Sequence, residues 1–388
     1  MNRVSIPLRL SLCSVGVFAL IGLALPFWPV WLTARGVSAE GIGTLVAISY
    51  FVRMVAGPGF SIWADHLGDR RLPFVALAGA YLAALGLFWF THSFLAIVMV
   101  TVIVSAVSAP LIPLKESLIM AWATARDFDY GRIRLWGSAA FIVVSMSAGF
   151  VITPFGPDAI LIGLMALAVL MVVSGYALPG DPRKVEVTTG PRVTWGALGA
   201  LISDWNFLLF LVGASFVQAS HAAYYAFGTL NWQSLGYSDG FIGMMWALGV
   251  LAEIVLFAFS GAVYRRVSAP LLIALGAGAA ILRWTMTALD PHWALLIPLQ
   301  CLHAFTFGAT HLGVMKYIAQ AVPNRLAASA QGIYAATSGG IVMGLVTLGA
   351  GPLYGAIGAH AYLPMAGLGL VGLAAAFLLS RRWRAARI

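Results

Sequence analysis

Apolar residues gather into twelve long runs along this chain, and short polar segments separate one run from the next. About 20 consecutive apolar residues are enough for one helix to cross the hydrocarbon core of a membrane. Each run is therefore predicted to be a membrane-spanning helix, which makes the fold class all-α and integral to the membrane. The runs cover residues 10–32, 41–62, 72–92, 94–122, 134–154, 158–178, 207–230, 239–264, 270–289, 292–318, 327–350 and 356–380.

The longest polar interval, residues 179–206, divides the predicted spans six and six. We therefore expect an N-terminal six-helix bundle at residues 1–178 and a C-terminal six-helix bundle at residues 207–388. The interval between them is predicted to be a central loop. The first apolar run is longer than the apolar part of a cleavable signal peptide, so we expect it to remain as a span.

Basic residues mark the loops on one side of the predicted membrane. The pairs Arg70-Arg71 and Arg265-Arg266 each follow the second run of their half, a weak repeat that is typical of two related bundles alternating access to a midplane site. With an even number of spans, both termini and the central loop fall on this same side, whereas Arg35 stands in a loop on the other. Because cytoplasmic loops are enriched in Lys and Arg, we expect both termini in the cytoplasm and a bacterial-type inner membrane as the location.

The composition excludes several classes of protein. Hydrophobic residues make up 61% of the chain and charged residues only 9%, with a mean hydropathy of +0.94. A soluble domain carries about 25% charged residues, so a water-soluble globular protein is excluded. The net charge of +9 comes from basic residues concentrated in the loops on one side of the predicted membrane, so no nucleic-acid partner is expected. Cys13 and Cys301 both lie in apolar runs, which excludes a disulfide scaffold.

The chain carries no H-E-x-x-H zinc motif, no Walker loop and no dinucleotide fingerprint. His303 and His311 are too far apart along a helix, about 12 Å, to share one metal. We therefore expect no enzyme activity, no metal and no cofactor, and a secondary active transporter with the proton as coupling ion is the leading interpretation. A membrane-embedded enzyme, a channel and a non-transporting sensor are the alternatives. The expected partners are a small-molecule substrate, protons and the lipid bilayer, and we expect a monomer.

Charged residues inside the predicted spans are the candidates for function, because a charge at the centre of a membrane helix costs about 2.5–3.5 kcal/mol. Glu116 and Arg134 stand on adjacent spans and are predicted to pair. A carboxylate that loses its partner in another conformation would take up a proton, which is the elementary step of symport. A static bridge that fixes two helices is the alternative.

Glu253 is the lone acid within the membrane part of the second half. Its neighbours along the chain are apolar, so an ionised and unpaired carboxylate would be expensive there. Arg283 and His303 are the partners available on the following spans. We expect either a proton-carrying site of Glu253 with His303, or a structural pair of Glu253 with Arg283.

The segment Ser61 to Arg71 resembles the signature loop of the major facilitator superfamily. Asp65, Gly68, Arg70 and Arg71 match that pattern, and Ser61 stands where a glycine is expected. The resemblance implies a fold of twelve transmembrane helices in two six-helix bundles. It also implies a conformational latch, in which the aspartate and the basic pair form ion pairs that differ between inward-facing and outward-facing states.

A narrower resemblance is carried by motifs in both halves. Two first-half segments are similar to the lactose permease type of proton symporter: Pro26 to Leu32 and Asp129 to Ser138. Second-half segments resemble the related phenylpropionate permease family: His221 to Tyr225, Trp232-Gln233, Leu248 to Glu253, Arg283-Trp284 and Leu302-His303. The resemblance implies that proton coupling involves Glu116, Arg134, Glu253, Arg283 and His303.

The same resemblance implies a proton symporter for a small aromatic monocarboxylate such as phenylpropionate, working by alternating access. An oligosaccharide or nucleoside symporter is the alternative. Phe141 and Thr306 fall where the lactose permease type has a tryptophan and a glutamate, so sugar transport is disfavoured.

A carboxylate substrate needs a cation, and arginine binds carboxylates through two donors. Arg53 has no acid within a helical turn and is predicted to bind the substrate, with Lys115 as a second cation. Snorkelling, or pairing with Glu116, is the alternative for Arg53. Aromatic residues are predicted to supply a stacking wall, although ordinary packing is the alternative for each: Trp28, Phe141, Tyr224, Tyr225 and Trp246.

Overall fold

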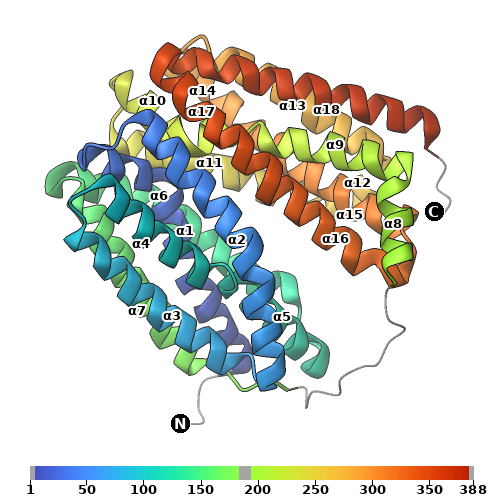
Figure 1. Ribbon diagram of the computed structural model, residues 1–388, viewed down its shortest axis with the longest axis horizontal. Coiled ribbons are helices and arrows are strands. Elements are labelled where there is room, and N and C mark those ends of the chain that lie inside the picture. Colours follow the sequence, from blue (N-terminus) through green and yellow to red (C-terminus); the bar gives the residue numbers. More distant parts are fainter. Residues whose placement is uncertain (1–4, 183–193, 384–388) are drawn as a thin grey trace. The chain divides into compact units, whose positions relative to one another are not determined.

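The computed structural model describes residues 5–182 and 194–383, apart from the side chain of Asp65. Within this part the chain is helical and contains no strand (Figure 1). Eleven helical stretches of the described residues are long and apolar enough to cross a membrane. The last stretch, Asn324–Arg382, has 59 residues and contains two of the predicted spans, 327–350 and 356–380. Its helix is interrupted at Gly358, which has a φ of +55°. Each of the twelve predicted runs therefore lies on helix.

The chain divides into two compact units. The first contains residues 1–187 and 232–247, and the second contains residues 188–231 and 248–388. The predicted bundle boundaries at residues 178 and 207 stay predictions, and part of the predicted central loop, residues 183–193, lies outside the described residues.

The helices of the first unit follow one another with short turns between them. The first helix, α1, packs against α6 and α7, and α2 packs against α4. The bounds are α1 (Ile6–Ala34), α2 (Ala39–Leu67), α3 (Arg71–Leu87), the 3-10 turn η1 (Phe88–Phe90), α4 (Phe94–Ser108), α5 (Leu111–Arg126), α6 (Tyr130–Phe155) and α7 (Asp158–Ala177).

Glycines let two pairs of helices of the first unit come into backbone contact. A methyl group at Gly22 of α1 would lie 2.8 Å from the carbonyl oxygen of Phe141 on α6. A methyl group at Gly149 of α6 would lie 2.0 Å from the carbonyl oxygen of Asp239, where α11 (Asp239–Ala258) begins. Because any side chain would collide there, these contacts require glycine.

The second unit contains shorter helices and two π-helical turns. Helix α13 packs on α18 and α15, and α9 packs on α18. The bounds are α8 (Trp195–Ser203), α9 (Trp205–Ala219), α10 (Ala222–Ser234), α12 (Ser260–Arg266), α13 (Ala269–Thr287), α14 (Trp293–Cys301), the π-helix η2 (Ala304–Ala309), α15 (Thr310–Ala321), the 3-10 turn η3 (Asn324–Leu326), α16 (Ala327–Ala335), the π-helix η4 (Ala336–Val342), α17 (Met343–Ile357), the 3-10 turn η5 (Gly358–Ala361) and α18 (Tyr362–Arg382).

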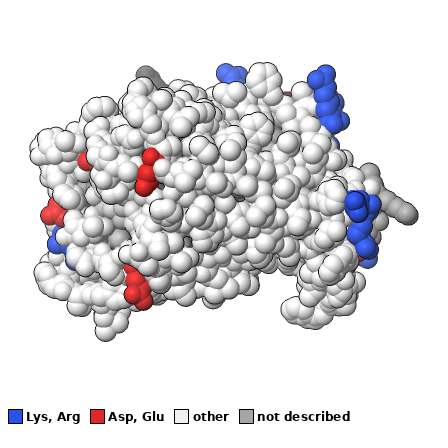
Figure 2. Space-filling view, turned by 90° about the horizontal axis from the view of Figure 1, so that it is seen from above, with Lys and Arg blue, Asp and Glu red and all other residues white. Residues whose placement is uncertain are grey.

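The molecular surface carries many large apolar side chains. Phe150, Val173, Leu370 and Phe377 are all more than 40% exposed, as expected of residues that face lipid. Most of the face drawn in Figure 2 is covered by residues other than Lys, Arg, Asp and Glu, as expected of helices that cross a membrane.

Candidate functional site

The first candidate group begins with the way α6 starts. Asp129 precedes the helix, and its carboxylate accepts hydrogen bonds from the backbone N–H groups of Gly131 at 2.8 Å and Arg132 at 3.3 Å. Such a cap satisfies donors that the first helical turn leaves unpaired. The start at this point places Tyr130 and Arg134 four residues apart, on one face of α6.

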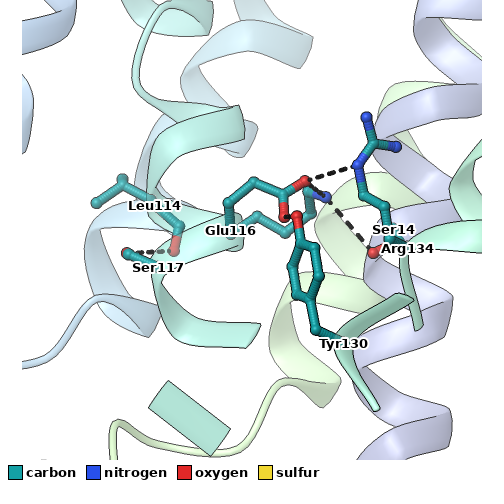
Figure 3. Close-up of polar contacts among 7 residues, drawn as sticks. Ser14, Leu114, Glu116, Ser117, Tyr130 and Arg134 are labelled. Carbon is teal, nitrogen blue, oxygen red and sulfur yellow. Dashed lines mark hydrogen bonds and ion pairs between the residues drawn. The ribbon is translucent and has the colours of Figure 1, made fainter. Parts of the chain in front are cut away.

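Glu116 of α5 stands opposite that face and has three partners (Figure 3). Its Oε1 lies 2.6 Å from Nζ of Lys115 and 3.5 Å from Nε of Arg134. Its Oε2 accepts a hydrogen bond of 2.6 Å from the hydroxyl group of Tyr130. The predicted contact between Glu116 and Arg134 is therefore present, whereas its part in proton coupling stays a prediction.

Lys115 is the closer cation and the better buried one. Its side chain is 0% exposed, against 38% for Arg134. Both cations also face the ring of Phe18 on α1, with Nζ at 4.8 Å and the guanidinium carbon at 4.1 Å from the ring centroid. The electrostatic partner on which the Glu116 carboxylate mainly depends is thus Lys115, because Coulomb attraction strengthens with proximity and with burial. Lys115 is paired with Glu116 here, and its predicted substrate role stays a prediction.

The predicted latch stays a prediction, and the structure shows the contacts of its basic pair. The side chain of Asp65 lies outside the described residues, and Gly68 ends α2 with a φ of +69°, a conformation that favours glycine. Nη1 of Arg70 lies 2.8 Å from Oδ2 of Asp181, just after α7, and Nη2 of Arg71 donates to the carbonyl oxygen of Tyr176 at 2.8 Å. The basic pair therefore ties the start of α3 to the end of α7.

The second candidate group lies within the second unit, around Arg283 of α13. The guanidinium is 0% exposed. Nη2 donates to Oε1 of Gln300 at 2.8 Å, and Nη1 lies 3.3 Å from Oγ1 of Thr306 and 3.2 Å from Nδ1 of His303. Gln300 belongs to α14, His303 directly precedes η2, and Thr306 lies within η2. The turn of α14 into a π-helix thus brings them all to one guanidinium.

Hydrogen-bonding capacity fixes the direction of this network. Arginine has only donors, so Nδ1 of His303 must accept, and a neutral His303 carries its proton on Nε2. That Nε2 lies 3.8 Å from Oε2 of Glu253 on α11. The hydroxyl group of Thr306 accepts from Arg283 and can donate to Nε2 of His221 at 2.9 Å. His221 then donates from Nδ1 to the carbonyl oxygen of Gln218 at 3.0 Å.

Aromatic rings enclose the guanidinium. Its carbon lies 4.7 Å from the ring centroid of Tyr224 and 4.5 Å from that of Trp284. The hydroxyl group of Tyr224 donates to the same Gln300 oxygen that accepts from Arg283, at 3.1 Å. The ring of Tyr225 stacks on His221 with centroids 5.4 Å apart. Two of the predicted aromatic residues, Tyr224 and Tyr225, therefore belong to this group.

The predicted approach of Glu253 to His303 is present. The alternative, an ion pair of Glu253 with Arg283, is not formed, because neutral acceptors occupy the guanidinium. Among the described residues no carboxylate makes an ion pair with Arg283, and its Nε has no hydrogen-bond partner.

Arg53 belongs to the first unit and makes none of the contacts described for the first group. Its side chain is exposed on α2, and the described groups that interact with its charge are the phenols of Tyr50 and Tyr81. It forms no ion pair within the described part of the chain, and Glu116 is paired elsewhere. Its predicted substrate role stays a prediction.

The other predicted aromatic residues take part in packing. Trp28 stacks on Trp31 with centroids 4.7 Å apart, and Trp246 meets Trp232 edge to face at 6.5 Å. Phe141 is buried in α6, at the close contact with α1. A cavity of about 690 Å³ lies elsewhere in the first unit, and its lining includes Arg35 but no member of either candidate group.

Sequence reasoning missed Gln300, Thr306 and Tyr130 as members of these groups. Gln300 precedes His303 by three residues and Tyr130 precedes Arg134 by four, so each shares a helix face with a predicted residue. That spacing is the signal that could have found them. No group of three metal-ligating side chains occurs among the described residues.

Comparisons with known proteins agree with this architecture. The profile of the MFS_1 like family matches residues 8–363. A protein from Escherichia coli (strain K12), described as a probable 3-phenylpropionic acid transporter, is 33% identical over 366 residues, which cover 92% of this chain and 93% of that protein.

Two solved structures of transporters show the same fold. The nucleoside transporter NupG superposes with a TM-score of 0.83 at 18% identity, covering 99% of this chain and 100% of that one. A D-xylose-proton symporter superposes with a TM-score of 0.69 at 14% identity, covering 98% of this chain and 97% of that one. At such identities the likeness establishes the fold and leaves the substrate open.

Proposed function

This chain belongs to the MFS_1 like family and is a multi-pass membrane transporter, and we propose that it carries a small aromatic monocarboxylate together with protons by alternating access. The proposal places it in a bacterial-type inner membrane with both termini in the cytoplasm. The basic residues that the sequence concentrates in the loops on one side of the predicted membrane support that orientation.

The observation that carries the proposal is the contact of Glu253 with His303 inside the second unit. Their closest oxygen and nitrogen atoms are 3.8 Å apart, on helices that are apolar and long enough to span a membrane. A carboxylate in such a place is stable when it is paired or protonated. Motion of the imidazole toward or away from the carboxylate therefore changes the affinity of the pair for a proton, which is what coupling requires.

The choice of substrate class rests on two supports. The relative from E. coli is described as a probable transporter of 3-phenylpropionic acid. The candidate group of this chain combines a buried cation, Arg283, with the aromatic rings of Tyr224 and Trp284. An aromatic acid needs a cation for its carboxylate and rings for its own ring.

Uptake into proteoliposomes tests the proposal. Purified protein is reconstituted, and the accumulation of radiolabelled 3-phenylpropionate is followed under an inward proton gradient. We expect saturable accumulation that a protonophore abolishes and that an inward sodium gradient does not replace. Because undissociated aromatic acids cross bilayers unaided, protein-free vesicles and vesicles with Glu253→Gln are run in parallel. Uptake equal to that of protein-free vesicles, or uptake that follows sodium, would contradict the proposal.

A further inference from the structure

Arg283 is a buried cation whose partners are all neutral. The residues that contact its guanidinium are Gln300, Thr306, His303, Tyr224 and Trp284, and none of them carries a negative charge. Its Nε is buried and lacks a hydrogen-bond partner among the described residues. Burying a guanidinium in this way is costly unless an anion joins it at some stage.

One edge of the guanidinium is half occupied. Nε and Nη2 point in the same direction and together form the fork that binds a carboxylate through two parallel hydrogen bonds. Here Nη2 donates to Oε1 of Gln300 at 2.8 Å, whereas Nε donates to no described group. The Gln300 oxygen also accepts from the hydroxyl group of Tyr224 at 3.1 Å. A neutral amide oxygen thus stands where one oxygen of a carboxylate would stand.

We propose that Arg283 is the residue that binds the carboxylate of the substrate, side-on through Nε and Nη2, in place of the Gln300 amide oxygen. The inference rests on the proposed function, because it names how that substrate class is recognised. The hydroxyl group of Tyr224 is released from Gln300 in this exchange and donates to the same carboxylate. The rings of Tyr224 and Trp284 flank the guanidinium and lie beside the bound acid.

This assignment also connects substrate binding to the proton site. Nη1 of the same guanidinium donates to Nδ1 of His303 at 3.2 Å, and Nε2 of that imidazole faces Glu253. A carboxylate that draws the guanidinium toward itself weakens the Nη1 contact. Nδ1 of His303 is then released to accept a proton. A substrate amide, which carries no charge, draws the guanidinium far less.

The test places a carboxylate permanently on the half-occupied edge. Gln300→Glu is compared with Gln300→Leu, which removes the oxygen, and with Gln320→Glu, which makes the same chemical change at a half-buried position of α15 outside the group. Binding of 3-phenylpropionate and of 3-phenylpropionamide to the purified full chain is measured by calorimetry, and thermal unfolding is followed without ligand.

We expect Gln300→Glu to raise the unfolding midpoint, because the guanidinium gains an internal partner, and to weaken binding of the acid by about tenfold or more. Gln320→Glu should change neither quantity. Arg283→Lys should also weaken binding of the acid by about tenfold or more, since lysine offers a point charge and no fork. Wild-type protein should bind the acid more tightly than the amide.

Three outcomes would overturn the assignment. The first is wild-type affinity for the acid in Gln300→Glu. The second is failure of Gln300→Glu to fold while Gln300→Leu folds, because a carboxylate would then not fit the edge. The third is loss of affinity in Arg53→Lys with wild-type affinity in Arg283→Lys. Absence of any binding of the acid to wild-type protein would instead contradict the proposed function, and the unfolding midpoint of Gln300→Glu would still test the anion site.

Discussion

Replacing Glu116 by glutamine is expected to destabilise the first unit far more than replacing Arg134 by glutamine. The reason is Lys115, whose side chain is 0% exposed and whose Nζ lies 2.6 Å from the Glu116 carboxylate. Glutamine keeps an acceptor for the hydroxyl group of Tyr130 but leaves the ammonium group without a counter-charge. From the sequence alone, Arg134 would be taken as the cation that Glu116→Gln leaves without a counter-charge. In the structure that cation is Lys115.

The magnitudes follow from burial. Removing one partner of a buried ion pair costs about 3–5 kcal/mol. Since the Glu116 side chain is 22% exposed, we expect the lower end for Glu116→Gln, about 3 kcal/mol. The side chain of Arg134 is 38% exposed, with its Nε 3.5 Å from the carboxylate. Its removal should therefore cost no more than an exposed pair, about 0–1 kcal/mol.

The assay is a pair of double-mutant cycles on purified protein, with equilibrium unfolding in mixed micelles. Adding Lys115→Met to Glu116→Gln should recover most of the lost stability, because both charges are then absent and methionine suits an apolar interior. Adding Arg134→Gln to Glu116→Gln should recover little. Equal costs for the two single glutamine substitutions, or no recovery with Lys115→Met, would refute the reasoning.

Three other predictions follow from the same structure. Glu253→Gln should abolish accumulation driven by a proton gradient while sparing substrate exchange at equal pH, measured by counterflow; accumulation at the wild-type level would make Glu253 structural. Gly149→Ala should reduce both uptake and thermal stability, because its methyl group would lie 2.0 Å from a carbonyl oxygen, whereas Gly349→Ala, which meets nothing within 4 Å, should change neither. Asp181→Asn should lower the free energy of unfolding by about 1–3 kcal/mol, because Arg70 loses a charged partner whose side chain is only 2% exposed; an unchanged unfolding curve would show that this ion pair does not stabilise the first unit.

The helices were predictable because every span needs about 20 consecutive apolar residues to cross the membrane. The run at residues 10–32 lies within α1, and the apolar pattern alone was enough to find it. Interruptions inside a span were not predictable in this way. The run at 239–264 is divided at Phe259 into α11 and α12, and the run at 292–318 contains the π-helix η2. Phe259 is apolar and η2 carries one small polar side chain, Thr306, so composition gives little sign of either interruption.

The candidate site was predictable for its charged members and for three residues of the family motifs, His303, Tyr224 and Tyr225. A charge within a span is rare and costly, so Glu116, Glu253 and Arg283 stand out in the sequence. Gln300 and Tyr130 do not stand out, because neutral polar side chains are common in such helices. Which partners meet depends on how each helix is rotated about its axis. A helix that is apolar on all sides, such as α1, encodes little about that rotation.

The most direct test of the central claim is whether protons enter with the substrate. Proteoliposomes are placed in a lightly buffered medium without a gradient, 3-phenylpropionate is added, and the external pH is recorded. We expect transient alkalinisation of the medium that saturates with substrate, exceeds that of protein-free vesicles and is lost in Glu253→Gln. Saturable entry of 3-phenylpropionate with no change in external pH beyond that of protein-free vesicles would contradict proton-coupled transport.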